Sequence, residues 1–271
     1  MFHGLSAFPL TPLREGKFDE QAFVQLLRPL VDAGVDSLGI LGSTGSYAYL
    51  TPEERTHITR CAVAHADNIP VSVSIGALRL DDILRLADEA QSAGARGVLL
   101  APVSYQRLTA EEVFTLYETV THRISVPLCI YDNPATTGFE FNDELLYAVA
   151  ALPNVKSVKL GRTPDNIAHM RARLPESVTL GISGDWRAAS VIAGLYPQTA
   201  LAIARAKDTA ASDRLAPLWA LFRQYGSLRV MAAAAEMSGK VAAPALPFPL
   251  ASLSGKPRET LAAILAELAL A

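Results

Sequence analysis

The sequence lacks a strong excess of charge and has no long apolar run. Its 24 Lys and Arg residues and 27 Asp and Glu residues give a net charge of −3. The basic residues are scattered along the chain, so a broad basic surface for nucleic acid is not expected. No apolar stretch approaches the ~20 residues that a membrane-spanning helix requires, so no membrane span is expected either.

Cysteine is almost absent, and the first residues do not resemble a secretion signal. Cys61 falls in a helical pattern and Cys129 in an apolar, strand-like segment, which is not the spacing of a disulfide framework. Pro9 and Pro12 interrupt the first apolar stretch, and no basic segment precedes it. We therefore predict buried, reduced thiols in a cytoplasmic protein.

Short apolar segments alternate with longer segments of helical periodicity. This pattern is typical of repeated strand–helix units around a parallel sheet. The predicted strands are residues 5–10, 37–41, 71–75, 97–101, 127–131, 155–159 and 178–182. Seven such units favour an α/β fold of the (β/α)8 TIM-barrel type over a doubly wound sheet, which usually has fewer strands.

Helix starts are marked by capping residues. Residues 51–54 and 109–112 are capping boxes, and Asp19, Asn142 and Thr163 indicate three further N-termini. Beyond about residue 207 the pattern becomes purely helical. The predicted helices there are residues 209–225, 228–240 and 257–270. We therefore expect a barrel over residues 1–206 and a C-terminal helical appendage over residues 207–271.

The last strand–helix unit is too short for a complete barrel. Only residues 187–194 separate Trp186 from Leu195, whereas a crossover between parallel strands takes ~10–12 residues. Either the seventh helix or the eighth strand is therefore missing. An open barrel, a rearranged element near residues 188–194 and exchange with a partner subunit are the alternatives.

The predicted strand ends bring together a lysine, a phenol and several hydroxyl groups. The second strand leads into residues 42–46 (Gly-Ser-Thr-Gly-Ser), and the fifth ends in residues 131–134 (Tyr-Asp-Asn-Pro). The sixth strand ends at Lys159, and the seventh leads into residues 183–185 (Ser-Gly-Asp). Catalytic groups of such barrels gather at the carboxyl ends of the strands, so we expect these residues to form one site.

Lys159 ends an otherwise apolar strand. Burying an ammonium ion there is costly, and desolvation favours the free amine, which attacks ketones. A side chain that reaches solvent or forms an ion pair is the alternative for a lysine at such a position. Lys156 lies an odd number of residues away and faces the opposite side of the strand. If Lys159 points into the barrel, Lys156 points outward.

The other strand-end groups suit a small anion and proton transfer. Ser43 and Thr44 offer hydroxyl and backbone N–H groups to a carboxylate, and Gly42 and Gly45 permit close approach, although the same glycines also suit a tight turn without a ligand. Tyr131 can shuttle protons near an amine, although a strand-end tyrosine is more often a core residue. The five histidines include no pair spaced to chelate a metal, so no metal or other cofactor is expected.

These motifs together resemble the pyruvate-dependent class I lyases that include dihydrodipicolinate synthase and N-acetylneuraminate lyase. The resemblance runs from Gly4 to about Trp186 and continues weakly through the C-terminal helices. It rests on Gly42-Ser43-Thr44-Gly45, Tyr131 through Pro134, Lys159 and Gly184-Asp185 at these spacings. It implies a TIM barrel, a homotetramer built as a dimer of dimers and chemistry through a covalent imine without a cofactor.

The resemblance also assigns catalytic roles. Lys159 would form the Schiff base with pyruvate or another 2-oxo acid, and Tyr131 and Ser43 would relay protons. A second tyrosine that crosses from the neighbouring subunit is implied, and Tyr105 is the candidate. The substrates implied are a small 2-oxo acid and an aldehyde, joined or released by a carbon–carbon lyase.

Substrate binding and specificity follow from the same resemblance. Thr44 and Gly45 would bind the carboxylate of pyruvate, and Gly184 would line the pocket. The synthase carries an arginine for its second substrate where this chain has Thr136, so synthesis of dihydrodipicolinate is not expected. Arg162 lies in the next loop, but nothing in the sequence shows that it compensates.

Two functions remain open at this point. The first is an active aldolase or lyase that condenses a 2-oxo acid with an aldehyde or catalyses the reverse cleavage. The second is a catalytically impaired family member that binds a 2-oxo acid or serves as an interaction protein. The shortened last unit and the absent arginine favour the second, whereas the complete set of lysine, tyrosine and hydroxyl groups favours the first.

Overall fold

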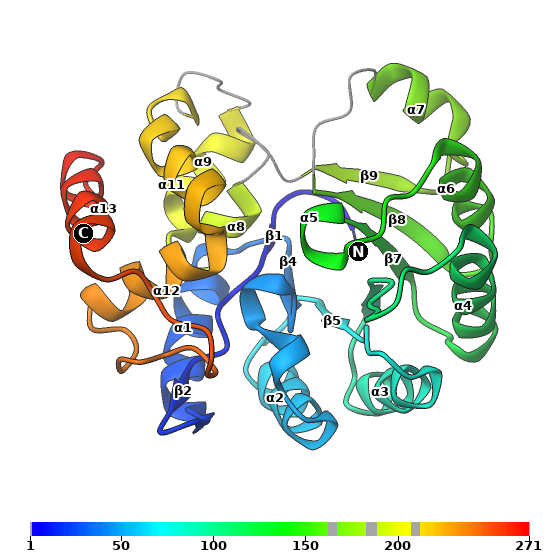
Figure 1. Cartoon of the computed structure of the whole chain (residues 1–271), viewed down its shortest axis with the longest axis horizontal. Coiled ribbons are helices and arrows are strands. Elements are labelled where there is room, and N and C mark those ends of the chain that lie inside the picture. The colour runs from blue at the N-terminus through cyan, green and yellow to red at the C-terminus, as the bar shows by residue number, and fades with distance from the viewer. Residues whose placement is uncertain (1, 162–166, 183–188, 207–211, 271) are drawn as a thin grey trace.

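Seven parallel strands form one curved sheet with helices on its outer side (Figure 1). The structure is a computed structural model that describes residues 2–161, 167–182, 189–206 and 212–270. The strands are β1 (Ser6–Ala7), β4 (Ser37–Ile40), β5 (Val71–Ser74), β6 (Gly97–Leu100), β7 (Leu128–Asp132), β8 (Val155–Leu160) and β9 (Thr179–Ile182), paired in this order. All seven predicted strands are confirmed. The first is shorter than predicted, because Pro9 has no N–H to extend the ladder.

Helices follow most strands and cover the outer face of the sheet. They are α1 (Glu20–Ala33), α2 (Pro52–Ala64), α3 (Leu80–Ser92), α4 (Ala110–Arg123), α6 (Asp143–Ala150) and α7 (Ile167–Arg173). Thr51 and Thr109 form the predicted capping boxes, and Asp19 and Asn142 accept hydrogen bonds from the first turns of α1 and α6. The predicted cap at Thr163 lies outside the described residues.

Shorter elements lie in the loops. The hairpin of β2 (Leu13–Arg14) and β3 (Lys17–Phe18) follows β1, the 3-10 helices η1 (Ser43–Gly45) and η2 (Tyr47–Tyr49) follow β4, and α5 (Pro134–Thr137) follows β7. These elements position backbone and side chains at the carboxyl ends of the strands. That is the edge where a parallel barrel places its functional groups.

After β9 the described chain contains helices and no further strand. After β9, the described chain continues with α8 (Ala189–Ala193), which contacts β1, and then with α9 (Pro197–Ala206), which contacts α1. The described residues therefore include no eighth strand, and β1 and β9 end the sheet without pairing with each other. Of the sequence-based alternatives, an open barrel is observed in the described part of the chain, with the short helix α8 against β1.

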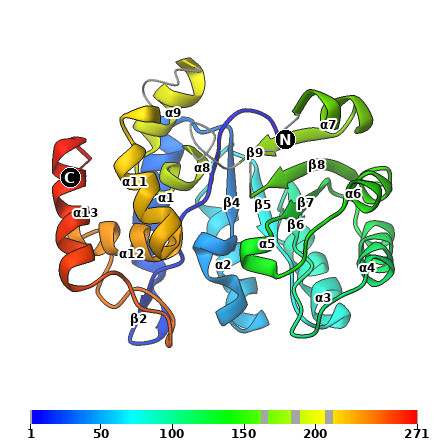
Figure 2. The same ribbon diagram turned by 45° about the horizontal axis from the view of Figure 1, so that its top comes forward.

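The remaining helices gather on one side of the barrel. These helices, α11 (Ala216–Tyr225), α12 (Ser227–Met237) and α13 (Gly255–Glu267), lie near α1 and α9 in both views (Figures 1 and 2). The predicted C-terminal helices are thus present, although residues 207–211, where the first was predicted to begin, lie outside the described part. The division into a barrel and an appendage at residue 207 stays a prediction.

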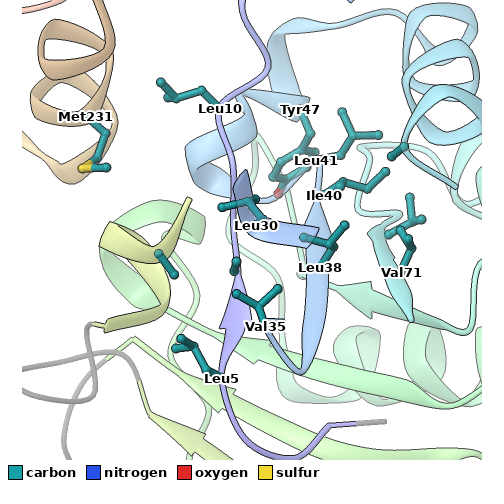
Figure 3. Packing of buried hydrophobic residues seen from close by; sticks show 14 of the residues in the cluster. Leu5, Leu10, Leu30, Val35, Leu38, Ile40, Leu41, Tyr47, Val71 and Met231 are labelled. Carbon is teal, nitrogen blue, oxygen red and sulfur yellow. The ribbon is translucent and has the colours of Figure 1, made fainter. Parts of the chain in front are cut away.

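The apolar core has two parts. A large cluster fills the space between the sheet and the helices, where Figure 3 shows Leu38 and Ile40 of β4 near Leu30 of α1. A small cluster of Phe8, Leu99, Ala101, Cys129 and Tyr131 lies inside the barrel. The interior therefore has little apolar filling, and polar groups share it. Both cysteines are buried and unpaired, as predicted.

Helix α12 supports the loop that follows β4. Residues 232–235 of this helix are four consecutive buried alanines, and α12 contacts η1. Small side chains allow the helix backbone to approach its neighbour closely. The C-terminal region thus sets the position of a loop at the edge of the barrel formed by the carboxyl ends of the strands.

Among the helices of the described ranges, none combines the length and the apolar character that a membrane span requires.

The loop between α12 and α13 is held by one buried carboxylate. The side chain of Glu236 is 2% exposed and lies 2.9 Å from the Arg258 guanidinium. It also accepts hydrogen bonds from the Ala245 N–H at 3.1 Å and from the Ser252 hydroxyl at 2.7 Å. A buried carboxylate with this many donors fixes the path of the loop around it.

We predict that Glu236→Ala lowers the free energy of unfolding by about 3 kcal/mol, because its buried donors lose their acceptor. Denaturant-induced unfolding followed by circular dichroism measures this change. Glu259→Ala removes an exposed carboxylate on α13 and should change stability by less than about 0.5 kcal/mol. Equal effects of the two substitutions would contradict the role assigned to Glu236.

Candidate active site

Lys159 lies inside the barrel at the carboxyl end of β8. The register of β7 and β8 places Tyr131 beside it. The Lys159 ammonium lies 4.0 Å from the ring centroid of Phe8 and 5.0 Å from that of Tyr131, and both rings belong to the interior cluster. Lys156 is exposed. The predicted orientation of the two lysines is therefore confirmed.

The surroundings of Lys159 are aromatic rather than acidic. Within the described part of the chain, no carboxylate pairs with its amine, so the ion-paired alternative is not observed there. Ring faces attract a cation, but they hold it less tightly than a buried carboxylate does. The amine is thus partly withdrawn from water without being neutralised by a carboxylate of the described residues.

Tyr131 is the centre of a hydrogen-bond network beside this amine. Its hydroxyl donates to Ser43 Oγ at 3.2 Å. The same oxygen accepts from Asn133 Nδ2 at 2.9 Å and from Thr136 Oγ1 at 3.5 Å. The structure therefore brings together Lys159, Tyr131 and Ser43, three of the four residues predicted to be catalytic.

The environment of Tyr131 favours loss of its proton. Burial by itself raises the pKa of the phenol, but the charge of Lys159 and the hydrogen bonds with Ser43, Thr136 and Asn133 outweigh it. The pKa of Tyr131 consequently lies below its ordinary value. A phenol of lowered pKa beside an amine is suited to accept and return protons.

The loop after β4 presents the groups predicted to bind a carboxylate. Ser43, Thr44 and Gly45 form the single turn η1, in which the Gly45 N–H donates to the Gly42 carbonyl at 2.9 Å. The N–H groups of Ser43 and Thr44, at the start of such a turn, have no partner within it. Thr44 and Gly45 are buried. A Cβ on Gly45 would lie 3.1 Å from Thr11 Oγ1, so only a small residue fits well there. The loop thus combines hydroxyl and amide donors close to Tyr131.

Three residues from the sequence analysis do not join this cluster in the described chain. Tyr105 is 91% exposed, so it does not contribute to the site of its own subunit. Gly184 and Arg162 lie outside the described residues. The part played by Gly184 in lining the pocket therefore stays a prediction.

The structure adds two residues to which the sequence analysis assigned no role. Phe8 lies beneath the Lys159 amine, and Asn133 contacts the Tyr131 hydroxyl. Asn133 is two residues beyond Tyr131, so strand alternation, which puts such residues on one face, was a usable signal. The sequence gives no such signal for Phe8, because an apolar residue beside a short strand has the same pattern whether its side chain faces the helices or the interior.

Among the described residues, no cationic side chain is hydrogen-bonded to the Tyr131 hydroxyl. Thr136 stands in the position where the synthase carries an arginine. It is exposed, and its side-chain hydroxyl is the group that contacts the Tyr131 hydroxyl. In the described ranges, no group of three or more His, Cys, Asp or Glu side chains is placed to hold a metal ion.

Glycines make room for Phe8 beneath Lys159. A Cβ on Gly39 of β4 would lie 2.3 Å from the Phe8 ring, and one on Gly42 would lie 2.9 Å from it. Both distances are shorter than any real carbon contact, so a side chain at either position would displace the ring.

We predict that Gly39→Ala lowers the free energy of unfolding by about 2 kcal/mol, because overpacking displaces Phe8. Gly181→Ala is the matched control, since its Cβ would make an ordinary 3.6 Å contact inside the same barrel. The control should change stability by less than about 1 kcal/mol. Thermal and denaturant unfolding measure both, and a neutral Gly39→Ala would show that Phe8 is not confined as described.

Comparisons with known proteins identify the family of the chain. The chain matches the sequence profile of the Dihydrodipicolinate synthetase family over residues 1–268. YagE of Escherichia coli K12, provisionally named a 2-dehydro-3-deoxy-D-gluconate aldolase, is 31% identical over 162 residues, covering 59% of this chain and 53% of that protein. The 4-hydroxy-tetrahydrodipicolinate synthase of Phenylobacterium zucineum is 30% identical over 160 residues, covering 59% and 54%. The chain thus spans about half the length of the curated relatives it matches.

Solved structures extend the likeness to nearly the whole chain. Dihydrodipicolinate synthase of Agrobacterium tumefaciens C58 has a TM-score of 0.93 and 39% identity, with 98% of each chain covered. YagE in complex with pyruvate has a TM-score of 0.90, with all of both chains covered, and its 23% identity limits that likeness to the fold. The α/β fold is therefore that of the TIM barrels of these synthases, with a shortened last unit. The chain belongs to the dihydrodipicolinate synthetase family.

Proposed function

We propose that the protein is a lyase or aldolase in which Lys159 forms a Schiff base with pyruvate or another 2-oxo acid. The observation that carries this proposal is the placement of the Lys159 amine beside Tyr131, whose hydroxyl bonds to Ser43. An amine, an acid–base group and an anion-binding loop are the parts that imine chemistry requires. Membership of the family supports the same reaction.

The reaction begins with attack of Lys159 Nζ on C2 of the 2-oxo acid. The resulting carbinolamine loses its hydroxyl as water and becomes an iminium ion. Loss of a proton from C3 then gives an enamine, which adds to the aldehyde carbon. Hydrolysis releases the product and restores the amine. Tyr131 and Ser43 are placed to supply and remove the protons in these steps.

The carboxylate of the 2-oxo acid is assigned to the loop after β4. Thr44 and Gly45 lie in η1, directly after Ser43, so a carboxylate held there keeps C2 near both Lys159 and Tyr131. Fixing the substrate at two points converts the attack into an intramolecular step. The mechanism needs no metal or organic cofactor, because the covalent imine itself stabilises the negative charge that develops at C3.

The second substrate is assigned as a neutral, hydroxylated aldehyde. Around the Tyr131 hydroxyl the available groups are the Asn133 amide and the Thr136 hydroxyl, which are uncharged. Without a bidentate guanidinium from the described residues, a carboxylate on the aldehyde would find no fixed partner there. We therefore propose condensation with, or release of, a hydroxyaldehyde. The provisional name of YagE, a sugar-acid aldolase, points the same way.

A catalytically impaired protein that binds a 2-oxo acid is the alternative. The observation that favours it is the absence of an eighth strand between β9 and β1 in the described residues. The groups assigned to the reaction, however, come from β7, β8 and η1, and the contacts among Lys159, Tyr131 and Ser43 do not involve the chain after β9. Trapping of the imine distinguishes the two functions.

We predict that borohydride in the presence of pyruvate adds one reduced pyruvyl group to the intact protein, detected by mass spectrometry. Lys159→Ala should abolish the adduct, because no amine remains at C2. Lys156→Ala, three residues away on the exposed face of the same strand, should leave it unchanged. A folded parent protein without the adduct would rule out the Schiff-base mechanism and leave the alternative.

We further propose a homo-oligomer, either a dimer or a tetramer, in the cytoplasm. Large apolar side chains are exposed in the segments that follow the adjacent strands β4, β5 and β6, namely in η2, before and at the start of α3, and after β6: Tyr49, Leu78, Leu80 and Tyr105. Such a patch at one edge of a barrel is typical of an interface. Burial of this patch against a second copy would bring Tyr105 to the neighbouring site, which is the role the family resemblance implies.

We predict that Leu78→Lys reduces the oligomer to smaller species in sedimentation velocity, because a lysine cannot be buried in an apolar interface without a partner. Leu78 is 68% exposed in the single chain. Phe248→Lys changes a residue that is 94% exposed on the loop before α13, outside this patch, and should leave the sedimentation coefficient unchanged. A parent protein that sediments as a monomer would contradict the proposed assembly.

A further inference from the structure

We propose that Asn133 is a positioning residue that fixes the direction of the Tyr131 proton. By donating to the phenol oxygen, its amide leaves the phenol proton directed at Ser43. The inference rests on the proposed Schiff-base reaction of Lys159, in which Tyr131 transfers protons. It assigns to Asn133 an effect through Tyr131 and no contact with the reacting atoms.

The side chain of Asn133 does not cap the helix that it precedes. Asn133 occupies the N-cap position of α5, where an asparagine side chain normally accepts a backbone N–H of the first turn. Here it makes no such bond, whereas Asn142, the N-cap of α6, accepts the Leu145 N–H at 2.8 Å. The Asn133 amide instead turns to Tyr131, at 2.9 Å.

Gly161 leaves the space in which the Asn133 side chain lies. A Cβ on Gly161 would come within 2.4 Å of Asn133 Cγ, and the Gly161 N–H bonds to the Asp132 carbonyl at 2.7 Å. The Asn133 side chain is thus held across the edge of β7 and β8, next to the strand end that carries Lys159. Neither its position nor its direction is left to a flexible loop.

The hydrogen-bonding capacity of a phenol explains why a donor here sets the proton direction. A phenol has one proton to donate and lone pairs to accept with. Asn133 donates to Tyr131 at 2.9 Å, whereas the single Thr136 proton is nearer to the Asn133 carbonyl, at 3.1 Å, than to Tyr131, at 3.5 Å. Ser43, at 3.2 Å, is the nearest acceptor for the phenol proton. When the phenolate forms, the bond from Asn133 becomes charge-assisted and strengthens.

This arrangement matters in two balanced proton transfers. Tyr131 first gives its proton, directly or through Ser43, to the carbinolamine hydroxyl, which leaves as water while the iminium ion forms. The phenolate then takes a proton from C3 of the iminium ion, which yields the enamine and the neutral phenol. A donor that stabilises the phenolate favours the first transfer and preserves the base for the second.

Two titratable groups of the described residues interact electrostatically with the Tyr131 phenol. Lys159 of β8 lowers its pKa, and Tyr47 of η2 is the second. Neither is altered by a substitution at Asn133, so a change in the titration of Tyr131 comes from the changed side chain at position 133 itself.

Asn133→Asp is the sharpest test, because the two side chains have the same shape but a carboxylate cannot donate. We predict that it raises the pKa of Tyr131 by ~1–3 units, through loss of a donor and gain of a negative charge. Carbon-13 NMR of Cζ-labelled tyrosines in the substrate-free protein measures this, with Tyr131→Phe to identify the resonance. Asn142→Asp makes the same chemical change at a remote cap and should leave the titration unchanged.

The rate effect is measured without knowledge of the aldehyde. Enamine formation exchanges the methyl protons of pyruvate with deuterium from the solvent, which proton NMR follows. We predict that Asn133→Asp slows this exchange ~10- to 100-fold at neutral pH and shifts its rise with pH upward. Gly161→Ala, which pushes the amide away by overlap with its Cγ, should act in the same direction. Asn142→Asp should exchange at the parental rate.

The outcomes separate this inference from the proposed function. If Tyr131 titrates at the same pH in the parent and in Asn133→Asp, the positioning role is overturned, even when the parent forms the borohydride adduct. If the parent neither forms the adduct nor exchanges the methyl protons, the Schiff-base reaction fails, and the role of Asn133 in that reaction fails with it. A raised pKa together with slowed exchange supports the proposal.

Discussion

The packing of Phe8 against backbone is the constraint on which the site depends. Its ring lies beneath the Lys159 amine and fits only because Gly39 and Gly42 carry no side chain. On its other side, a Cβ at Gly194 would lie 2.3 Å from the Phe8 carbonyl oxygen. The position of one aromatic ring therefore links β1, the loop after β4, the segment after α8 and the reactive lysine.

Much of the fold could be predicted from the sequence, because it follows from local rules. Strand alternation located the seven strands, and capping residues such as Thr51 and Asn142 marked the helix starts. The short helix α8 could not be predicted, since five residues of mixed small and apolar character fit a strand or a helix equally well. Its conformation depends on what lies beside β1.

The candidate site divides in the same way. Lys159, Tyr131 and Ser43 could be predicted because each ends or follows a recognisable strand, and parallel strands bring their ends together. Asn133 was missed because an asparagine before a short helix suggests a helix cap, although strand alternation from Tyr131 was a usable signal. The proposed contribution of Tyr105 depends on a second copy of the chain. The pattern of one sequence does not show how a second copy is placed.

The shortened last unit shows where such a barrel tolerates a change in chain length. The reacting groups come from β7, β8 and the loop after β4, whereas the lost strand belongs between β9 and β1. The tight contact of Gly194 with the Phe8 backbone and the contact of α8 with β1 tie this region to the part of the barrel that holds Lys159. Lys159, Tyr131 and Ser43 nevertheless come together although β9 and β1 do not pair in the described part of the chain. The arrangement of these three groups therefore does not depend on a closed ring of strands.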